Sequence, residues 1–467
     1  MRASALLLLL AVSGSESDVP ARLVGGALTG GRAYATAQSL TDRIGARPAG
    51  SVSAERAVEW ALAELRAAGL KNVRKEPVKV PHWVRGEESA ELLAPSSEIL
   101  HVTALGGSVA TAAGGVSAEV VEAGSFEEIK ALGVKARGRI VLINKPVARS
   151  PHGDGYGQVV PLRHSGAVAA AQVGAVAALL RSVGTGAHRL PHTGMTSYED
   201  GTPKIPFAAL AAEDADLLHR LLASGEKPRV KLRLGCQQLG DVDSSNVMGE
   251  VPGRDKAGEI VLLGAHLDSW DLGTGAIDDG AGCAIVIEAA RLIAHLPTPP
   301  RRTVRVVLFM NEEFGLSGAR AYAERHKNEL DKHVAALEAD SGAGRPLGFS
   351  VTGDEHALAL VRKWVAPLAT LQAAEVSSTR FGGADVIPMQ IRGVPAVGLQ
   401  QDMSSYFDWH HTAADTLDKI DPLELAWSAG AAAVLAWAAA EARETLPRPA
   451  PTAQPSWMGP SEPQKAK

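Results

Sequence analysis

The second half of the chain contains apolar runs that alternate with helix-like runs, and this alternation constrains the fold more than any other feature. The apolar runs have the length and composition of strands, whereas the segments between them have helical spacing. This order is typical of an α/β sandwich with a largely parallel sheet. The runs predict strands at 259–265, 303–310, 333–339 and 394–399 and helices at 280–295, 318–326 and 422–445.

The middle of the chain has a different pattern. It is a self-contained mixture of strand-like and helix-like runs, with few clustered Asp, Glu and His residues. We therefore expect an inserted domain over residues 101–235, and a discontinuous main domain over 18–100 and 236–446. The inserted runs predict strands at 116–121, 138–143 and 229–234 and helices at 165–181 and 212–223. A further helix is expected at 53–70, where Gly69 provides a stop signal.

The overall composition supports a folded protein of two domains. A chain of 467 residues exceeds the size at which one hydrophobic core usually stops growing. With 46% hydrophobic and 21% charged residues, it has enough apolar side chains for a packed core. The net charge of −5 and the absence of a basic block do not favour binding to nucleic acid or to a membrane surface.

Both ends of the chain differ from its body. Residues 1–17 contain one Arg, an apolar segment at 3–12 and then small residues, which is the pattern of a secretory signal peptide, although an N-terminal helix is the alternative. The apolar segment is too short to span a bilayer and no Cys follows it to carry a lipid, so we expect a secreted or periplasmic protein without a membrane anchor. Residues 447–467 are rich in Pro and polar residues and are expected to form a disordered tail.

The chain has only two cysteines, Cys236 and Cys283. At most one disulfide is possible, and the sequence leaves open whether the two residues pair. The fold therefore cannot depend on a disulfide framework, and a zinc site built from cysteines is excluded.

The stretch AHLDSWDLGTGAIDDG at 265–280 follows the first apolar run of the main domain. It contains one histidine and four aspartates but no lysine or arginine. A carboxylate removed from water is costly unless it is paired, protonated or bound to a cation. A metal ion is therefore the leading candidate for the partner of these acidic residues.

Other polar residues follow the remaining apolar runs. In open α/β sheets the ligand-binding crevice lies at the carboxyl ends of the strands, so separate chain segments can deliver their residues to one rim. Imidazole and carboxylate groups are normal ligands of zinc. The residues expected at this rim are His266, Asp268, Glu312, Glu313, Asp340 and His411.

Each of these residues has a plain structural interpretation when it is taken alone. The Glu312-Glu313 pair suits a solvated helix start, Asp340 suits a helix cap, and His411 suits a structural role. Together they are more specific, because each follows an apolar run. Nucleotide sites are disfavoured because G-x-x-x-x-G-K-[ST] and a well-placed G-x-G-x-x-G are absent. The segment 315–318 is not the G-x-S-x-G motif of a serine hydrolase.

The order H-x-D, A-x-D-D-G, N-E-E, a later D and then H-T-x-x-D-T resembles the co-catalytic di-zinc aminopeptidase family. The segments 81–89, 191–194 and 203–206 narrow the likeness to one branch, and the resemblance covers roughly residues 35–445. It implies a three-layer α/β/α zinc-peptidase domain with a mixed, largely parallel sheet, and an inserted protease-associated-like α+β domain. It also implies two Zn²⁺ per chain, dipeptides or short peptides with free termini as substrates, and a homodimer.

The resemblance also implies a role for each metal ligand. It places His266 and Asp340 on one zinc, Glu313 and His411 on the other, and Asp278 as a bridge between them. A bridging carboxylate of this kind is what a two-metal site requires. The family often has a cis peptide within A-x-D-D-G, so we expect one between Asp278 and the next residue.

Two further residues receive catalytic roles. Glu312 is the expected general base, which takes a proton from the attacking water and passes it to the leaving amine. Asp268 is expected to accept a hydrogen bond from His266 and so to fix the imidazole tautomer. His410 is the alternative to His411, which is preferred because it begins the H-T-x-x-D-T motif.

Two substrate-binding residues are expected near the end of the main domain. Asp385 belongs to the segment 381–388, which either faces the substrate or is simply a turn before the next strand. Tyr406 either polarises the scissile carbonyl or fills the core.

Three alternative functions remain open at this point. An aminopeptidase of broader specificity would use the same metals, and a glutaminyl cyclase would use one zinc. A noncatalytic, receptor-like binding protein would keep the architecture after losing its ligands, and the complete ligand set argues against it.

Overall fold

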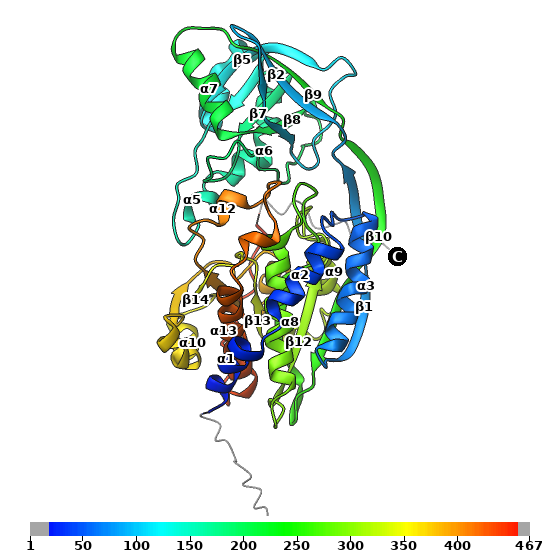
Figure 1. The fold of residues 1–467 in the computed structure, drawn as a ribbon, viewed down its shortest axis with the longest axis vertical. Coiled ribbons are helices and arrows are strands. Elements are labelled where there is room, and N and C mark those ends of the chain that lie inside the picture. The colour runs from blue at the N-terminus through cyan, green and yellow to red at the C-terminus, as the bar shows by residue number, and fades with distance from the viewer. Residues whose placement is uncertain (1–17, 456–467) are drawn as a thin grey trace, which may run out of the picture.

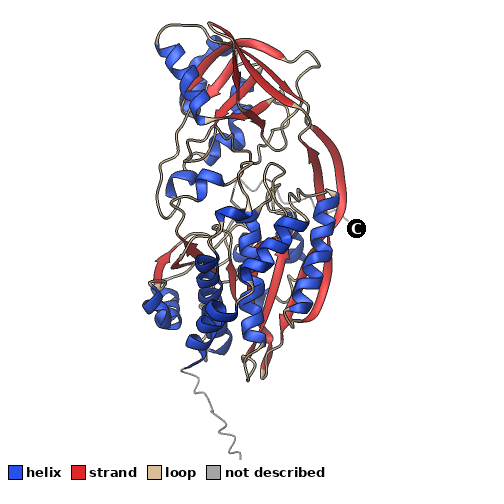
Figure 2. Cartoon of the chain, viewed as in Figure 1, coloured by secondary structure: helices blue, strands red, loops and turns tan. Residues whose placement is uncertain are grey.

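The structure is a computed structural model that describes residues 18–455. The expected signal peptide at 1–17 and the last part of the expected tail, 456–467, lie outside the described residues. The chain forms two domains stacked along the long axis of the molecule (Figure 1). Figure 2 shows that their strands form two separate groups, joined by one long two-stranded ribbon.

The larger domain is built on an eight-stranded sheet. In spatial order its strands are β1 (Lys71–Val84), β10 (Gln237–Val251), β12 (Arg302–Phe309), β11 (Lys256–His266), β13 (His333–Glu338), β16 (Ala396–Gln401), β14 (Pro346–Val351) and β15 (Glu375–Ser378).

The strands in the centre of this sheet run parallel. β11 pairs in parallel with β12 and β13, and β13 pairs in parallel with β16. Antiparallel pairs, such as β1 with β10 and β14 with β16, flank this centre. The predicted α/β domain with a mixed, largely parallel sheet is therefore confirmed.

Helices cover both faces of the sheet, which explains why its central strands are continuous apolar runs. Leu263 and Val306 pack into the core under one group of helices, whereas Leu262 and Val307 pack under the other. The first group comprises α1 (Val19–Gly30), α2 (Ala33–Arg43), α3 (Val52–Ala67), α8 (Ala281–Ala294), α10 (Glu355–Val365) and α13 (Pro422–Glu441). The second comprises α9 (Ser317–Arg325) and α11 (Ile387–Gln390).

Shorter helical segments complete this domain. They are η3 (Ala276–Gly280), η4 (Leu330–Lys332), η5 (Ala366–Leu371), α12 (Tyr406–Trp409) and η6 (Leu417–Lys419). The long helix α13 has the length and hydropathy of a membrane span, but 72% of its apolar window is buried inside the protein. Its many contacts with α8 and α1 show that it is a core helix of this domain.

The smaller domain contains a second eight-stranded sheet. In spatial order its strands are β3 (Glu98–Leu100), β2 (Glu88–Ala94), β9 (Arg229–Leu234), β5 (Val116–Ala123), β6 (Ile140–Ile143), β7 (Ala177–Arg181), β8 (Phe207–Leu210) and β4 (Val102–Ala104). The expected inserted domain began at residue 101, but β2 and β3 already belong to its sheet because β2 pairs with β9. The second sheet therefore begins at Glu88, and the domain boundary at residue 100 is corrected accordingly.

The helices of the smaller domain are α4 (Phe126–Leu132), η2 (Gly133–Ala136), α5 (Asp154–Gly157), α6 (Val160–Gln172) and α7 (Ala212–Ala223). The prediction of one helix over 165–181 was wrong in its second half. Gly174 adopts a φ of +84°, which suits glycine and ends α6. The following apolar residues form β7, which pairs with strands on both sides.

The prediction of a disordered tail was wrong for residues 447–455. Arg448 donates hydrogen bonds to the backbone oxygens of Leu330, Asp331 and His333. The backbone N–H of Thr452 donates to the oxygen of Ile391 at 3.0 Å. These hydrogen bonds hold the segment against the larger domain.

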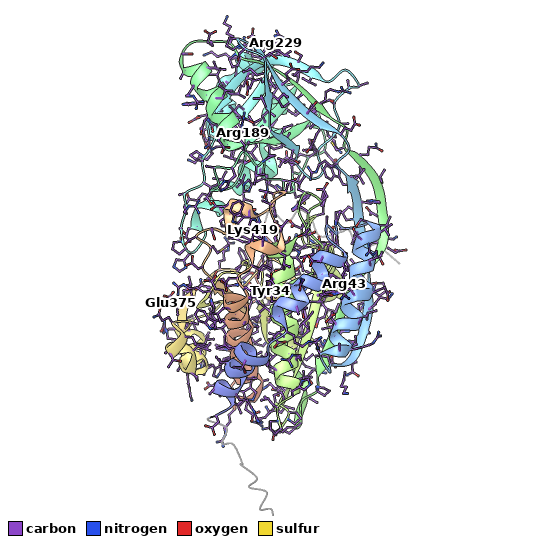
Figure 3. The ribbon with its side chains drawn as sticks, viewed as in Figure 1. Tyr34, Arg43, Arg189, Arg229, Glu375 and Lys419 are labelled. Carbon is purple, nitrogen blue, oxygen red and sulfur yellow. The ribbon has the colours of Figure 1, made fainter. Side chains whose placement is uncertain are left out.

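Side chains from both domains meet between α5 and α12, which lie near the junction in Figure 1. Arg149 donates two hydrogen bonds to the Asp408 carboxylate, at 2.6 and 2.9 Å. His188 stacks on Trp409 with a centroid distance of 4.7 Å. Lys419, labelled near this junction in Figure 3, lies 5.0 Å from the centre of the same indole ring. The two cysteines are buried and remain free thiols.

Candidate metal centre

The carboxyl ends of the central strands bring the predicted site residues together. His266 is the last residue of β11, and Glu312 and Glu313 follow β12 closely. Asp340 follows β13, and His411 follows α12. Because β11 lies between β12 and β13 in parallel, these ends share one edge of the sheet.

Asp278 lies at the centre of the cluster, and its two carboxylate oxygens face different partners. Its Oδ1 is 3.0 Å from His266 Nε2, which is also 3.7 Å from Asp340 Oδ1. Its Oδ2 is 3.1 Å from His411 Nε2, which is also 3.1 Å from Glu313 Oε2. The five expected metal ligands therefore form two groups that share one carboxylate.

The charge of the cluster calls for a cation. Among residues 18–455, no Lys or Arg forms an ion pair with these carboxylates. Burial raises the pKa of Glu313 and of Asp340. Burial would also raise the pKa of Asp278, but contacts with His266 and His411 bring it well below its usual value. Such closely spaced buried carboxylates are stable only if a positive charge lies among them.

The donor set fits metal ions at this position. Asp278 Oδ2 and Glu313 Oε1 are buried and form no hydrogen bond among the described residues. A zinc ion with bonds of about 2.0–2.1 Å in tetrahedral geometry keeps its ligand atoms ~3.3 Å apart. The observed separations of 3.0 to 3.7 Å match this spacing.

The turn that carries Asp278 has the expected backbone feature. The peptide bond between Asp278 and Asp279 is cis, as the resemblance implied. Asp279 lies near His266 and Asp340, but both of its oxygens already accept hydrogen bonds from the backbone N–H groups of His266 and Gly282, at 3.0 and 2.9 Å. Gly282 is required here, since a Cβ atom would lie 1.9 Å from the oxygen of Ala339.

Asp268 has a different contact from the one expected. His266 Nδ1 donates to the backbone oxygen of Asp268 at 3.1 Å, whereas the Asp268 carboxylate is 3.8 Å away. Asp268 Oδ1 instead accepts hydrogen bonds from the backbone N–H groups of Asn311 and Glu312, at 2.7 and 3.0 Å. The backbone oxygen is the closer acceptor because the chain turns directly after β11. The His266 tautomer is thus set by the main chain, and the carboxylate positions the Glu312 segment.

Glu312 lies close to the same carboxylates, but it is not one of the five expected metal ligands. Burial raises its pKa well above the usual value, and the neighbouring carboxylates of Glu313, Asp340 and Asp385 add to this shift. A carboxylate that holds a proton more readily than usual suits the receipt and return of a proton near neutral pH.

His411 fits the ligand role better than the alternative, His410. His411 approaches both Asp278 and Glu313, while His410 Nε2 approaches only Asp278 Oδ2, at 3.3 Å. His411 Nδ1 donates to the backbone oxygen of Thr193 at 3.2 Å, which leaves Nε2 free to bind a metal. Thr193 belongs to the inserted domain, so that domain contributes directly to the site.

The two expected substrate-binding residues lie close to the cluster. Asp385 is fully buried, and neither of its carboxylate oxygens forms a hydrogen bond among the described residues. Its backbone N–H donates to Glu338 Oε1 at 3.0 Å. Tyr406 is 8% exposed and lies 4.9 Å from His410 between ring centroids. Both residues are near the metal cluster, and their contact with a substrate stays a prediction.

Sequence reasoning missed Arg47, which is fully buried and shapes the turn that precedes Asp278. Its guanidinium donates to the backbone oxygens of Leu267, Thr274 and Gly275, at 2.6, 2.7 and 2.9 Å. A lone Arg some 220 residues from its partners gives no sequence signal. Asp415, the D of the H-T-x-x-D-T motif, accepts from the same turn, and that motif was a usable signal.

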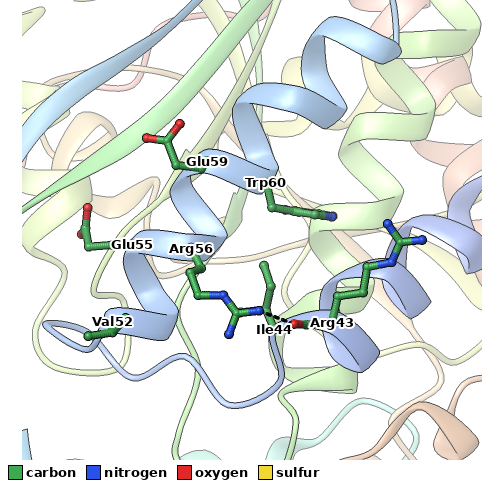
Figure 4. Close-up of a pocket in the computed structure, with 7 residues that line it drawn as sticks. All are labelled: Arg43, Ile44, Val52, Glu55, Arg56, Glu59 and Trp60. Carbon is green, nitrogen blue, oxygen red and sulfur yellow. Dashed lines mark hydrogen bonds between the residues drawn. The ribbon is translucent and has the colours of Figure 1, made fainter.

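An open pocket elsewhere on the surface contains none of the predicted site residues. It lies between α2 and α3 and has no His residue (Figure 4). Its lining residues are Arg43, Ile44, Val52, Glu55, Arg56, Glu59 and Trp60. A smaller and less open pocket is lined in part by Asp278, Glu313 and His411, so the strand-end cluster borders a hollow of its own.

Comparison with known proteins agrees with this geometry. Residues 246–436 match Peptidase family M28. Carboxypeptidase Q from Mus musculus is 40% identical over 417 residues, which are 89% of this chain and 87% of that protein. The crystal structure of a peptidase M28 precursor from Shewanella amazonensis is 44% identical, with a TM-score of 0.90 over 93% of this chain and 99% of its own.

A more distant structure shares the fold. A zinc aminopeptidase from Bacillus subtilis is 20% identical, with a TM-score of 0.63 over 87% of this chain and 94% of its own. The family resemblance predicted from the motifs is confirmed by the full-length relatives. The chain therefore belongs to Peptidase family M28, in the branch that contains carboxypeptidase Q.

Proposed function

We propose that this protein is an exported di-zinc exopeptidase that hydrolyses dipeptides or short peptides with free termini. The observation that carries the proposal is the position of Asp278, whose two oxygens face separate ligand groups. His266 and Asp340 would hold one zinc, Glu313 and His411 the other, and Asp278 would bridge them. This donor set of imidazoles and carboxylates is typical of co-catalytic zinc.

The chemistry that two zinc ions supply when bound is acidification of a water molecule and polarisation of the scissile carbonyl. Glu312 accepts one proton from the attacking water and delivers it to the nitrogen of the departing amine. The C–N bond breaks, and the second proton of the water passes from the new acid to the amine, so that the products are a carboxylate and an ammonium group. Asp268 holds the backbone of Glu312 through its hydrogen bond of 3.0 Å, so that the base stays aimed at the reacting atoms.

Contacts from the inserted domain lie over the metal cluster, and they support cleavage at the ends of peptides. The backbone N–H of Thr193 donates to the oxygen of His411 at 2.9 Å, which ties a loop of the inserted domain to the ligand segment. Trp270 fits so closely under Gly106 of the same domain that a Cβ atom there would lie 2.0 Å from the indole. A long peptide would have to pass through these contacts, whereas a dipeptide would not.

The test combines metal analysis with a cleavage assay on the purified protein. We expect two zinc ions per chain and release of free amino acids from an unblocked dipeptide mixture. A chelator should abolish this release and added zinc should restore it. C-terminally amidated peptides distinguish a broader aminopeptidase from the proposed enzyme, because an aminopeptidase needs only the free amine whereas the proposed enzyme needs both free termini.

The contrary outcomes are equally specific. A single metal per chain would favour the glutaminyl cyclase alternative. Absence of both metal and cleavage would contradict the proposal and favour a binding protein. An Asp278→Ala variant provides the control, since it should lose metal and activity together.

The proposals of export and of a homodimer have separate tests. Export rests on the apolar segment at 3–12, and N-terminal sequencing of protein recovered outside the cytoplasm should reveal a shortened chain. The dimer rests on the family resemblance, and analytical ultracentrifugation of the purified protein should give twice the mass of one chain.

A further inference from the structure

The guanidinium group of Arg163 lies in an unusual environment. Arg163 is on α6 of the inserted domain and is only 9% exposed. No carboxylate among residues 18–455 forms an ion pair with it, and its Nε is buried without a hydrogen-bond partner. A buried cation without a counter-charge is costly, because desolvation of its charge is not offset. This observation points to an anion that is absent from the polypeptide itself.

The surroundings of Arg163 hold its side chain in one position. Its Nη1 donates a hydrogen bond of 2.6 Å to the Tyr156 hydroxyl. Its Cζ lies 5.5 Å from the centre of the Tyr156 ring, which is a favourable cation–π distance. Gly194 lies against the other side, and a Cβ atom at Gly194 would come within 2.5 Å of Arg163 Cζ. The glycine therefore leaves just enough room for the guanidinium.

Tyr156 connects Arg163 with the metal centre. Its ring lies edge-on to His410 with a centroid distance of 5.1 Å, and His410 in turn approaches Asp278. Burial raises the pKa of Tyr156 to about 12, so the hydroxyl keeps its proton. That hydroxyl accepts from Arg163, and no hydrogen bond that it donates is found among residues 18–455. Arg163 and Tyr156 thus present a buried charge and an unused O–H donor on the same side of the metal centre.

Arg163 connects to the metal centre through a short series of ring contacts. One imidazole ring and one phenol ring separate Asp278 from Arg163. In Figure 1, α6 lies on the side of the inserted domain that faces the larger domain.

We propose that Arg163, assisted by the Tyr156 hydroxyl, binds the free α-carboxylate of the substrate and so selects peptides whose C-terminal residue follows the scissile bond. This inference rests on the proposed peptidase function and adds a specificity-determining site in the inserted domain. Charge-assisted hydrogen bonds to a carboxylate are the strong contacts that Arg geometry favours. The inserted domain then limits the length of the substrate on the C-terminal side of the scissile bond.

The test compares one dipeptide with its C-terminal amide, on the zinc-loaded full-length protein. The wild type should cleave the free acid far better than the amide. The Arg163→Met variant should lose roughly 100-fold in kcat/KM on the free acid, mainly through KM, and change less than about threefold on the amide. Tyr156→Phe should show a smaller loss with the same selectivity. Arg229→Met is the matched control, because Arg229 is an exposed arginine of the same domain, labelled at its far end in Figure 3.

Thermal unfolding of each variant separates a folding defect from a binding defect. If Arg163→Met lowers activity equally on both substrates, Arg163 is only structural and the inference is overturned. If the wild type cleaves acid and amide equally well, the inference and the requirement for a free C-terminus both fail, while the zinc-dependent peptidase activity stands. If it cleaves neither although two zinc ions are bound, both fail. Rescue of the free-acid activity by Arg163→Lys, which restores the charge, is expected in part.

Discussion

Asp268 Oδ1 accepts a hydrogen bond from the backbone N–H of Glu312 at 3.0 Å, and this contact joins the ends of two neighbouring strands. The same oxygen accepts from Asn311 at 2.7 Å, so one buried carboxylate fixes the start of the segment that carries the expected base and a ligand. The rim of the sheet is therefore held by backbone contacts in addition to any metal.

Replacement of Asp268 by Ala should lower kcat without removing the metal. The variant leaves two buried N–H groups without an acceptor, and the base then loses its position. Residues that orient catalytic groups typically contribute about 10–100-fold. Steady-state kinetics together with elemental analysis check this prediction. Loss of metal from Asp268→Ala would show that Asp268 is a ligand, contrary to the geometry.

Replacement of Glu312 by Gln should keep both metals and nearly abolish turnover. The amide has the same shape but cannot accept a proton, and general base catalysis typically contributes about 10²–10⁴-fold. Glu313→Gln is the matched comparison, because the adjacent residue is an expected ligand and its variant should bind less metal. Substantial activity in Glu312→Gln would remove this residue from the proposed mechanism.

Arg47→Met should destabilise the protein markedly. The buried oxygens of Leu267, Thr274 and Gly275 would lose their donor, and each unsatisfied buried group costs ~1–3 kcal/mol. We expect a loss of about 3 kcal/mol or more in the free energy of unfolding, measured by urea denaturation at fixed zinc concentration. Arg43→Met, an exposed arginine nearby, is the control and should leave the midpoint nearly unchanged. Equal midpoints for the two variants would contradict the role assigned to Arg47.

Protonation of His333 should lower the free energy of unfolding when the pH falls below about 6.5. Burial lowers its pKa from 6.5 to about 4, because the protonated imidazole is poorly solvated beside Arg305. A lowered folded-state pKa means that the stability is fully present above pH 6.5 and is lost as the pH falls toward 4.

A His333→Gln variant should therefore show a flatter pH dependence of its free energy of unfolding in this interval. Full titration of such a shift corresponds to roughly 3 kcal/mol. His356→Gln, at an exposed histidine, should retain the wild-type dependence. Metal release affects all three proteins alike, so the difference between the variants isolates His333. Parallel curves for His333→Gln and the wild type would contradict the prediction.

The rim of the sheet was predictable because its signal is local. Each of His266, Glu313 and Asp340 lies within three residues of the end of an apolar run, and the parallel arrangement of the runs places their ends together. The same reasoning failed where the contacts are remote in the chain. Arg47 donates to backbone oxygens some 220 residues away, and a single arginine has no periodicity to mark it.

The errors in the inserted domain have a related cause. Residues 165–181 are almost uniformly apolar or small, so their spacing does not distinguish a helix from a buried strand. Only the pairing of β7 with its neighbours decides the structure of the second half. Likewise β2 and β3 are short, and their membership of the second sheet depends on β9, which lies more than a hundred residues later.

The long ribbon of β1 and β10 shows how the inserted domain is attached to the larger domain. Val84 at the end of β1 lies opposite Gln237 at the start of β10, so the inserted domain leaves and re-enters the larger domain at adjacent points. A tight turn between these two residues would close an ordinary hairpin and preserve every strand of the first sheet. The shortened protein would keep all five expected ligands but lose Thr193 above His411 and the Arg163 subsite. The ligand residues and the contacts that orient His411 therefore belong to different domains, although they meet at one site.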